Sequence, residues 1–462
     1  MSTSCSTAIA SSDAGTRRSH WPLVTVALGF VMAMLDVTVV NVALDHLQSD
    51  LSIPLSGLLW VVDGYTLTFA SLLLTGGALA NRYGARTIYM TGLAVFLTAS
   101  LMCAIAPNGD VLIAARLAQG IGAALFMPSS LSLLSQSYPD EKERITALGI
   151  WSAIVSVAAA SGPIVGGAIV ATLGWRGIFW LNVPIGLLGL VMARRHLAPS
   201  PRRAQALNPV SHTLGMLALG TLAFGLIEGG NLGWSSRSII AAFVLALFAT
   251  VAFVIRECRE ASPIFPRDLF QDARFAATNG FGFLINLGAF GQIFLISLYV
   301  EQARGNDAWH TGLNLLPLMA MFTAGNLISA RISSRLGTRI PMLFGVAAAA
   351  ILCPVVVITG MRLPYDLFIP LLMAANLGVG IAIPAMTTTV MQVAGQSHAN
   401  IAAAALNANR QVGTLIGVAA MGVVLHALPD WHKALPVAFG VITLAYAGAA
   451  LLAGRYLGGS HR

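Results

Sequence analysis

The pentapeptide Arg82-Tyr83-Gly84-Ala85-Arg86 has a near-copy, Arg335-Leu336-Gly337-Thr338-Arg339, 253 residues further along the chain. Each copy follows one long apolar stretch and precedes another. Glycine readily adopts backbone conformations that other residues avoid, so a Gly between basic residues is typical of a tight turn after a helix. The repeat therefore predicts two halves of similar design, each with a basic turn after its second helix.

Apolar stretches like those beside the repeat fill most of the chain. A helix needs about 20 apolar residues to cross a bilayer, and fourteen stretches are of this kind. They are residues 21–44, 57–80, 87–106, 111–134, 145–173, 177–197, 212–230, 236–256, 276–300, 308–331, 340–360, 365–392, 398–427 and 431–457. Backbone polar groups must be satisfied within lipid, so we expect each stretch to be a helix.

The composition excludes an ordinary soluble protein. Only 10% of the 462 residues are charged, 56% are hydrophobic and the mean hydropathy is +0.78, whereas soluble domains carry about 25% charged residues. We therefore expect an all-α integral membrane protein. Two six-helix halves should cover residues 21–197 and 276–457, and a linker at 198–275 should add two central helices. Short tails are expected at 1–20 and 458–462.

The distribution of basic residues predicts the orientation of the chain in the membrane. With the N-terminus in the cytoplasm, nineteen Lys and Arg lie in cytoplasmic segments and five in outer loops. By the positive-inside rule, this asymmetry indicates an even number of spans with both termini cytoplasmic. The basic residues occur in short clusters between apolar stretches, so we expect no nucleic-acid surface. The N-terminal segment has no apolar core, so we expect a tail there and no signal peptide.

Several short motifs follow one another along the chain. They are residues 35–44 (LDVTVVNVAL), 76–86 (GGALANRYGAR), 116–122 (RLAQGIG), Ala158 with 162–167 (GPIVGG), Trp175-Arg176, and 182–186 (NVPIG). Together they resemble the major facilitator superfamily, and within it the fourteen-span drug:proton antiporters. The resemblance implies a major facilitator fold and a multi-pass protein of the bacterial inner membrane that exchanges a small molecule for protons.

The resemblance also implies roles for two groups of residues. A gating loop would consist of Gly77, Asn81, Arg82, Gly84 and Arg86. An antiporter motif would consist of Ala158, Gly162, Pro163, Gly166 and Gly167. Three residues depart from the family pattern: Asn81 stands where Asp is usual, Asp45 where Pro is usual, and Ala158 where Gly is usual.

Ionisable groups inside a bilayer are costly and usually functional. With a helical rise of about 1.5 Å per residue, Asp36, Asp63 and Arg116 are expected at similar depth in the first half. Two carboxylates and one guanidinium leave one negative charge uncompensated, which suits a proton carrier. We expect Asp36 to be the main carrier and Asp63 to assist it. A static salt bridge that holds the bundle together is the alternative.

Polar residues also occur inside spans of the second half. Asn279, Phe283, Asn286 and Phe290 follow each other at steps of four, three and four residues, which places them on one helical face. This face would contact a bulky substrate, or else pack against a neighbouring helix. Arg410 lies in the middle of a span, where it would bind an anionic group, a carboxylate of another helix, or backbone carbonyls.

The leading hypothesis is a proton-driven exporter of small lipophilic or cationic compounds or antibiotics, acting by alternating access as a monomer. Its rivals are a dedicated metabolite exporter or an uptake symporter of the same fold and, more distantly, a membrane receptor or enzyme. The chain has no nucleotide-binding P-loop and no enzyme motif. No cysteine pair has the spacing of metal ligands. We therefore expect no ATP coupling, no catalysis, no cofactor and no metal.

Overall fold

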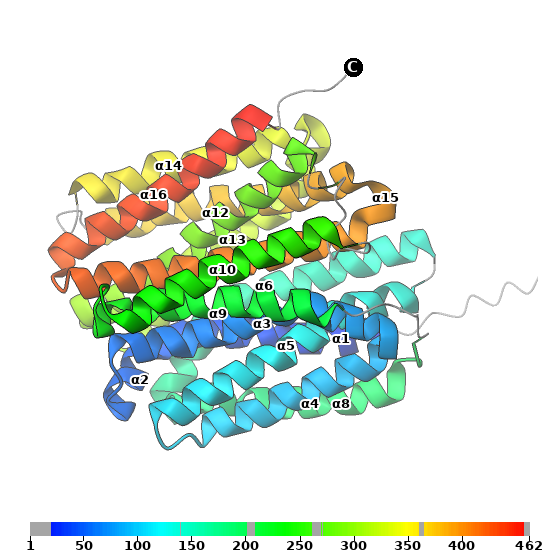
Figure 1. Cartoon of the computed structure of the whole chain (residues 1–462), viewed down its shortest axis with the longest axis horizontal. Coiled ribbons are helices and arrows are strands. Elements are labelled where there is room, and N and C mark those ends of the chain that lie inside the picture. The colour runs from blue at the N-terminus through cyan, green and yellow to red at the C-terminus, as the bar shows by residue number, and fades with distance from the viewer. Residues whose placement is uncertain are drawn as a thin grey trace, which may run out of the picture.

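Helices account for nearly all of the residues described by a computed structural model, which are 20–138, 140–200, 208–260, 269, 271–359 and 365–456 (Figure 1). In chain order the helices are α1 (Trp21–Val39), η1 (Val40–Ala43), α2 (Leu44–Leu51), α3 (Leu55–Tyr83), α4 (Ala85–Ala104), α5 (Gly109–Ser137), α6 (Glu141–Leu173), α7 (Arg176–Trp180), α8 (Asn182–His196), α9 (Pro209–Leu232), α10 (Arg237–Arg259), α12 (Ala273–Leu298), η2 (Tyr299–Ala303), α13 (Ala308–Leu336), α14 (Arg339–Thr359), α15 (Tyr365–Ala427) and α16 (Trp431–Tyr456). The tails expected at 1–20 and 458–462 lie outside the described residues, apart from His20.

In the described part of the chain, fourteen helices are long and apolar enough to cross a membrane. This confirms the number of spans expected from the sequence and makes the chain a multi-pass membrane protein. The expected spans at 365–392 and 398–427 are two arms of α15, and the helical geometry is interrupted between them at Gly395, where φ is 65°.

The first span extends further than expected. The sequence predicted its end at residue 44, but η1 and α2 continue it to Leu51. The α2 segment is amphipathic, because Leu44 and Leu47 are buried while Asp45 and most of its other polar residues are not. A search for continuous apolar sequence therefore ended the span too early.

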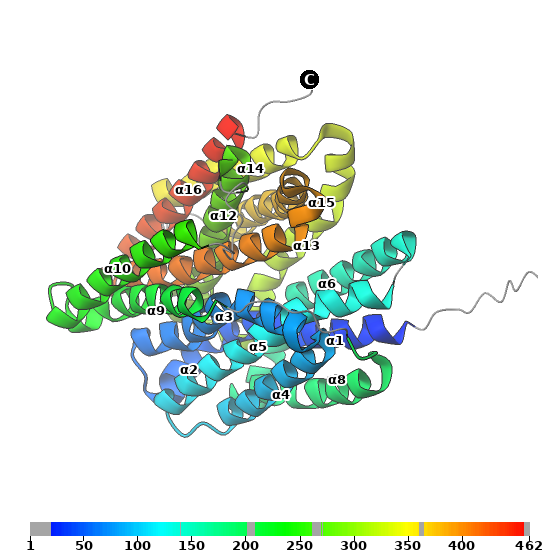
Figure 2. The ribbon, with the colours of Figure 1, turned by 45° about the vertical axis from the view of Figure 1, so that its right-hand side comes forward.

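The helices form two groups, α1–α8 and α12–α16, which are distinguished by colour in Figures 1 and 2. The pair α9 and α10 packs together, and α9 contacts both α3 and α15. We call the face where α1 begins and α16 ends the terminal face, and the face where α2 and α4 end the opposite face. Each span crosses between these two faces.

The internal repeat has a structural counterpart at the terminal face. Arg86, in the first turn of α4, donates a hydrogen bond of 2.8 Å to the carbonyl of Arg194 near the end of α8. Arg339 begins α14 and donates one of 3.1 Å to the carbonyl of Gly454 near the end of α16. A guanidinium at a helix C-terminus satisfies an otherwise unpaired carbonyl and the helix dipole. Equivalent arginines thus tie the third span to the sixth span in each group.

Paired glycines bring neighbouring helices close together in both groups. A Cβ on Gly122 of α5 would lie 2.8 Å from the carbonyl oxygen of Gly92 of α4. In the second group, a Cβ on Gly345 of α14 would overlap the carbonyl of Gly378 of α15. The repeat offset of 253 residues maps Gly92 onto Gly345. Small residues let membrane helices approach closely, so the two halves share this packing as well as their basic turns.

Polar contacts join the two groups near the opposite face. Glu301 of η2 accepts a hydrogen bond of 3.3 Å from the backbone N–H of Asp45, and the amides of Gln302 and Gln48 are 3.0 Å apart. The hydroxyl of Ser297 donates to the carbonyl of Asn41. These contacts join η1 and α2 to α12 and η2 near the opposite face.

Candidate functional site

A buried ion pair lies at the centre of the first group. One terminal nitrogen of Arg116 in α5 is 2.5 Å from Oδ2 of Asp36 in α1, and both residues are buried. The Nε of Arg116 donates a 2.9 Å hydrogen bond to the carbonyl of Val61 in α3. The guanidinium also lies 4.7 Å from the ring centre of Tyr65. Three helices thus converge on one guanidinium, as the similar depths of Asp36 and Arg116 led us to expect.

Uncharged polar side chains complete the hydrogen bonding of Asp36. Its Oδ1 accepts bonds from the amide of Gln119, at 3.2 Å, and from the amide of Asn182, at 2.9 Å. The same two amides donate to the hydroxyl of Ser100, at 2.6 and 3.2 Å. Charge-assisted bonds from several donors stabilise an ionised carboxylate. Asp36 therefore accepts hydrogen bonds from Arg116, Gln119 and Asn182 within one connected network.

Asp63 has a different environment from Asp36. It is completely buried on α3, and neither of its carboxyl oxygens has a hydrogen-bond partner among the described residues. Leu59 lies one helical turn before Asp63, on the same face of α3. It packs so closely against Gly422 of α15 that a Cβ on this glycine would overlap the Leu59 side chain. Asp63 is therefore on the side of α3 that faces the second group. The sequence placed it with Asp36 and Arg116, but it lies outside their hydrogen-bonded network.

The antiporter motif packs between the two groups. Gly162 and Gly166 of α6 contact α1, because a Cβ on Gly162 would overlap the side chain of Thr38 and one on Gly166 would lie 3.0 Å from Val39. Both contacts are within a turn of Asp36. On its other side α6 meets α13, where a Cβ on Gly167 would lie 2.7 Å from the carbonyl oxygen of Ala308.

The other members of the motif have related positions. A Cβ on Gly312 of α13 would overlap the carbonyl of Pro163, and Ala158 is buried. The α6 helix therefore touches the helix that carries Asp36 and also the second group.

We expect Gly167→Ala to weaken closure at the opposite face, because the new methyl group would meet the backbone of α13. Gln48→Cys with Gln302→Cys should be joined by a short bifunctional thiol cross-linker when the two groups are in contact, since the native side chains meet with their amides 3.0 Å apart. Gly167→Ala should lower the yield of this cross-link several-fold. Gly440→Ala is the control, because a Cβ there meets no atom within 4 Å. Equal yields in both variants would contradict this account of α6.

The loop motif lies at the terminal face. Gly84 has φ 94°, which favours glycine, and a Cβ there would lie 3.1 Å from the carbonyl oxygen of Ser200. Besides capping α8, Arg86 donates its backbone N–H to the hydroxyl of Ser200 at 3.3 Å. Arg82 and Asn81 are exposed, and a Cβ on Gly77 would meet no atom within 4 Å. The loop thus contacts the chain that leaves α8.

The polar stripe on α12 is mostly engaged in packing. The amides of Asn279 and Asn286 are buried and donate to carbonyls of their own helix, each at 2.9 Å. Asn409 of α15 donates to the carbonyl of Asn279 at 2.6 Å. Phe283 and Phe290 are only half-buried. Of the four residues, the two aromatic rings are therefore the ones most available to another molecule.

Arg410 of α15 has no such partner. It is half-buried, and its buried Nε has no hydrogen-bond partner in the described part of the chain. Its aliphatic stem lies against α12, where a Cβ on Gly282 would be 3.3 Å from the Cγ of Arg410. The carboxylate or carbonyl partner considered from the sequence is not observed among the described residues.

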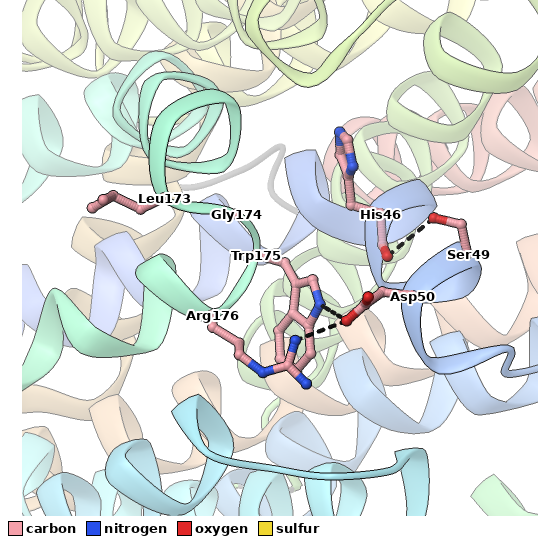
Figure 3. A pocket seen from close by; sticks show the side chains of 7 residues that line it. All are labelled: His46, Ser49, Asp50, Leu173, Gly174, Trp175 and Arg176. Atoms are coloured by element: carbon pink, nitrogen blue, oxygen red, sulfur yellow. Dashed lines mark hydrogen bonds and ion pairs between the residues drawn. The ribbon is translucent and has the colours of Figure 1, made fainter.

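A surface pocket of about 450 Å³ lies away from these residues, at the opposite face (Figure 3). Within it Asp50 accepts hydrogen bonds from Trp175 at 2.8 Å and from Arg176 at 2.7 Å. Arg176 stacks on the Trp175 ring at 4.2 Å and donates to the carbonyl of Ala106. These contacts fasten α2 to the turn between α6 and α7.

Sequence reasoning missed the uncharged residues of the buried network. Gln119, Ser100 and Asn182 are each buried in a mostly apolar stretch of helix, and Gln119 and Asn182 had attracted notice only as parts of motifs. Gln119 follows Arg116 by three residues, so the two share a helical face. That spacing was the available signal. The positions of Ser100 and Asn182 depend on tertiary packing.

Residues 26–418 match the model of the Major Facilitator Superfamily. The chain is 49% identical to the Methylenomycin A resistance protein of Bacillus subtilis, and the match covers 94% of each chain. It is 45% identical to the Methylenomycin A resistance protein of Streptomyces coelicolor, covering 96% of this chain and 94% of the relative. The Tetracenomycin C resistance and export protein of Streptomyces glaucescens is 31% identical over 89% of this chain and 77% of its own length.

A solved structure shares the fold at low sequence identity. It is a POT family transporter in complex with a thioalcohol conjugated peptide, with a TM-score of 0.69 and 14% identity over 92% of this chain and 94% of that chain. Together with the fourteen spans, the buried charges and the repeated halves, these matches define a transporter of the membrane. The chain belongs to the major facilitator superfamily.

Proposed function

We propose that this protein is a proton-coupled efflux transporter, which exports small lipophilic or cationic compounds or antibiotics by alternating access. Two relatives at 49% and 45% identity are named for resistance to methylenomycin A, and a third is named for resistance to and export of tetracenomycin C. The observation that carries proton coupling is the contrast between the two buried acids. Asp36 is paired with Arg116, whereas Asp63 has no partner in the described structure.

This contrast supports a site that holds one proton. An unpaired ionised carboxylate is strongly disfavoured in a buried apolar position, so Asp63 carries the proton in the state seen here. Asp36 remains paired with Arg116. Loss of the proton from Asp63 would create an unpaired charge on the face of α3 that meets the second group. Protonation of Asp63 would therefore favour this arrangement, and deprotonation would favour a rearranged one.

The two halves at 21–197 and 276–457 are, in this proposal, the bodies that move against each other. The pair α9 and α10 within 198–275 contacts both. The loop of Gly77, Asn81, Arg82, Gly84 and Arg86 would control opening at the terminal face, and Phe283, Phe290 and the neighbouring asparagines would contact the substrate. The transporter would act as a monomer in the bacterial inner membrane, without ATP, a cofactor or catalysis.

We expect the terminal face to lie in the cytoplasm. In a cysteine-free background, Ser200→Cys should resist a membrane-impermeant thiol reagent applied to whole cells, because nineteen of the Lys and Arg residues would lie on that side. Asn108→Cys, in an exposed turn at the opposite face, should react. Labelling of Ser200→Cys from outside would overturn the orientation.

Everted membrane vesicles test the function itself. Methylenomycin A and tetracenomycin C should accumulate in energised vesicles that contain the protein, and an uncoupler should abolish this accumulation. Export that persists after the uncoupler would contradict proton coupling. Movement in the opposite direction would favour an uptake symporter, and restriction to a single cellular metabolite would favour a dedicated exporter.

A further inference from the structure

Arg410 is an unpaired guanidinium in the middle of a membrane span. It lies 15 residues beyond Gly395 and 17 before the end of α15 at Ala427, so about 25 Å of helix separates it from the opposite face. Its Nε is buried without a partner in the described residues. The residue is nevertheless half-buried overall, so the outer part of its guanidinium is accessible. A lone cation at such depth is costly and needs an anionic partner.

The acids of the first group do not supply this partner. Asp36 already accepts hydrogen bonds from Arg116, Gln119 and Asn182. The carboxyl of Asp63 has no hydrogen-bond partner among the described residues, and α3 packs against α15. Asp63 could therefore pair with Arg410 only if the two side chains lie close enough along these helices.

The contact between Leu59 and Gly422 fixes the offset of α3 and α15. Asp63 is four residues from Leu59 and Arg410 is twelve from Gly422, and the two helices run in opposite directions. At about 1.5 Å per residue, Asp63 and Arg410 are therefore displaced by about 12 Å along the helix axes. Helical side chains lean toward the N-terminus of their own helix, which increases this separation. The Asp63 carboxyl is out of reach of the Arg410 guanidinium.

Local packing directs the Arg410 side chain. Its stem passes over Gly282 of α12. Met386 and Leu406 pack against the same glycine, because a Cβ added to Gly282 would lie 3.1 Å from the sulfur of Met386 and 2.8 Å from Leu406. Met386 belongs to the first arm of α15, whereas Leu406 and Arg410 belong to the second. The stem therefore lies among α12 and both arms of α15. Asn409, beside it, donates its amide N–H to the carbonyl of Asn279.

We propose that Arg410 is a substrate-binding residue that recognises the carboxylate of a small organic anion. A guanidinium presents two parallel N–H donors that match a carboxylate, and the aromatic rings of α12 lie on the helix that its stem crosses. The proposal rests on the proposed function and adds compounds that bear a carboxylate as one class of its cargo. A carboxylate at Arg410 would supply the missing negative charge, and its release would leave the cation unpaired again.

Matched probes of different charge test this assignment. Purified wild-type protein should be stabilised against heat by benzoate or 1-naphthoate, and less by benzamide or benzylammonium. Arg410→Gln should lose about ten- to hundredfold in affinity for the carboxylates, while Arg410→Lys should retain part of it. Arg331→Gln, a change at an exposed residue of α13, is the control and should bind like the wild type.

The stability of the unliganded variant separates binding from a structural role. Removal of an unpaired buried charge should leave the unfolding temperature of Arg410→Gln unchanged or raised. A clear fall would mean that the charge has a structural partner and would overturn the proposal. Three other results would also overturn the proposal. In the first, benzylammonium stabilises the wild type and the carboxylates do not. In the second, none of the probes stabilises the wild type. In the third, the carboxylates stabilise Arg410→Gln as much as they stabilise the wild type.

Transport distinguishes this proposal from the one on which it rests. If wild-type vesicles show no uncoupler-sensitive export, the efflux function fails, and the substrate assignment fails with it. If wild-type vesicles export, and Arg410→Gln exports carboxylate and neutral compounds in the same ratio as the wild type, only the role of Arg410 is wrong. Selective loss of carboxylate export in the variant supports both.

Discussion

Asp63→Asn is expected to produce a folded protein that has lost uphill export. Asn has the size of a protonated Asp and carries no charge, so it reproduces the neutral form that the buried, unpartnered site favours. The variant should reach the membrane at normal levels and unfold at or near the wild-type temperature. Because its side chain cannot release a proton, accumulation in energised vesicles should fall at least tenfold.

The control for this prediction is Asp110→Asn, the same change at an exposed residue in the first turn of α5. It should lose little stability, since an acid at a helix N-terminus contributes about 0.3–1 kcal/mol, and it should export normally. Normal uphill export by Asp63→Asn would remove Asp63 from the coupling mechanism. Loss of the folded protein would mean that its carboxyl has a structural role.

Asp36→Asn should behave differently, because it breaks an ion pair. The change leaves the buried guanidinium of Arg116 without its counter-ion, and breaking a buried pair in this way costs about 3–5 kcal/mol. We expect low protein levels and a markedly lower unfolding temperature, measured in detergent. The protein that does fold should not export, because the first group then has lost its fixed anion.

The double variant Asp36→Asn with Arg116→Gln isolates the pair. It removes both charges and leaves neutral amides that can hydrogen-bond with Gln119 and Asn182, so most of the lost stability should return while export stays absent. Recovery of stability without recovery of export would show that the pair serves both folding and transport. If the stability lost in the double variant equals the sum of the losses in the two single variants, the two charges do not interact.

The fold could be predicted from the sequence because bilayer physics leaves few choices. Fourteen apolar stretches can only be helices in lipid, and the spacing of Arg82–Arg86 and Arg335–Arg339 marks the repeat. The structure adds what this spacing could not show, namely that Arg86 and Arg339 each cap the sixth span of their own half. The extension of the first span to Leu51 was missed because α2 is amphipathic.

The candidate site could be predicted only in part. Depth along a helix follows from residue number, and it placed Asp36 near Arg116 correctly. The direction of a side chain around the helix axis depends on which neighbours pack there. Arg116 donates to the carbonyl of Val61 on α3, while Asp63, two residues further on, lies on the face of α3 that meets α15. The sequence alone therefore could not separate Asp63 from the Asp36–Arg116 pair.

The most direct test of the account is proton movement driven by substrate. Protein is reconstituted in vesicles that contain a pH-sensitive dye, and an exported compound is added to one side. The wild type should move protons in the direction opposite to the compound. Asp63→Asn should still exchange the compound across the membrane but move no protons with it. Proton movement in Asp63→Asn equal to that of the wild type would contradict the claim that this buried acid carries the coupled proton.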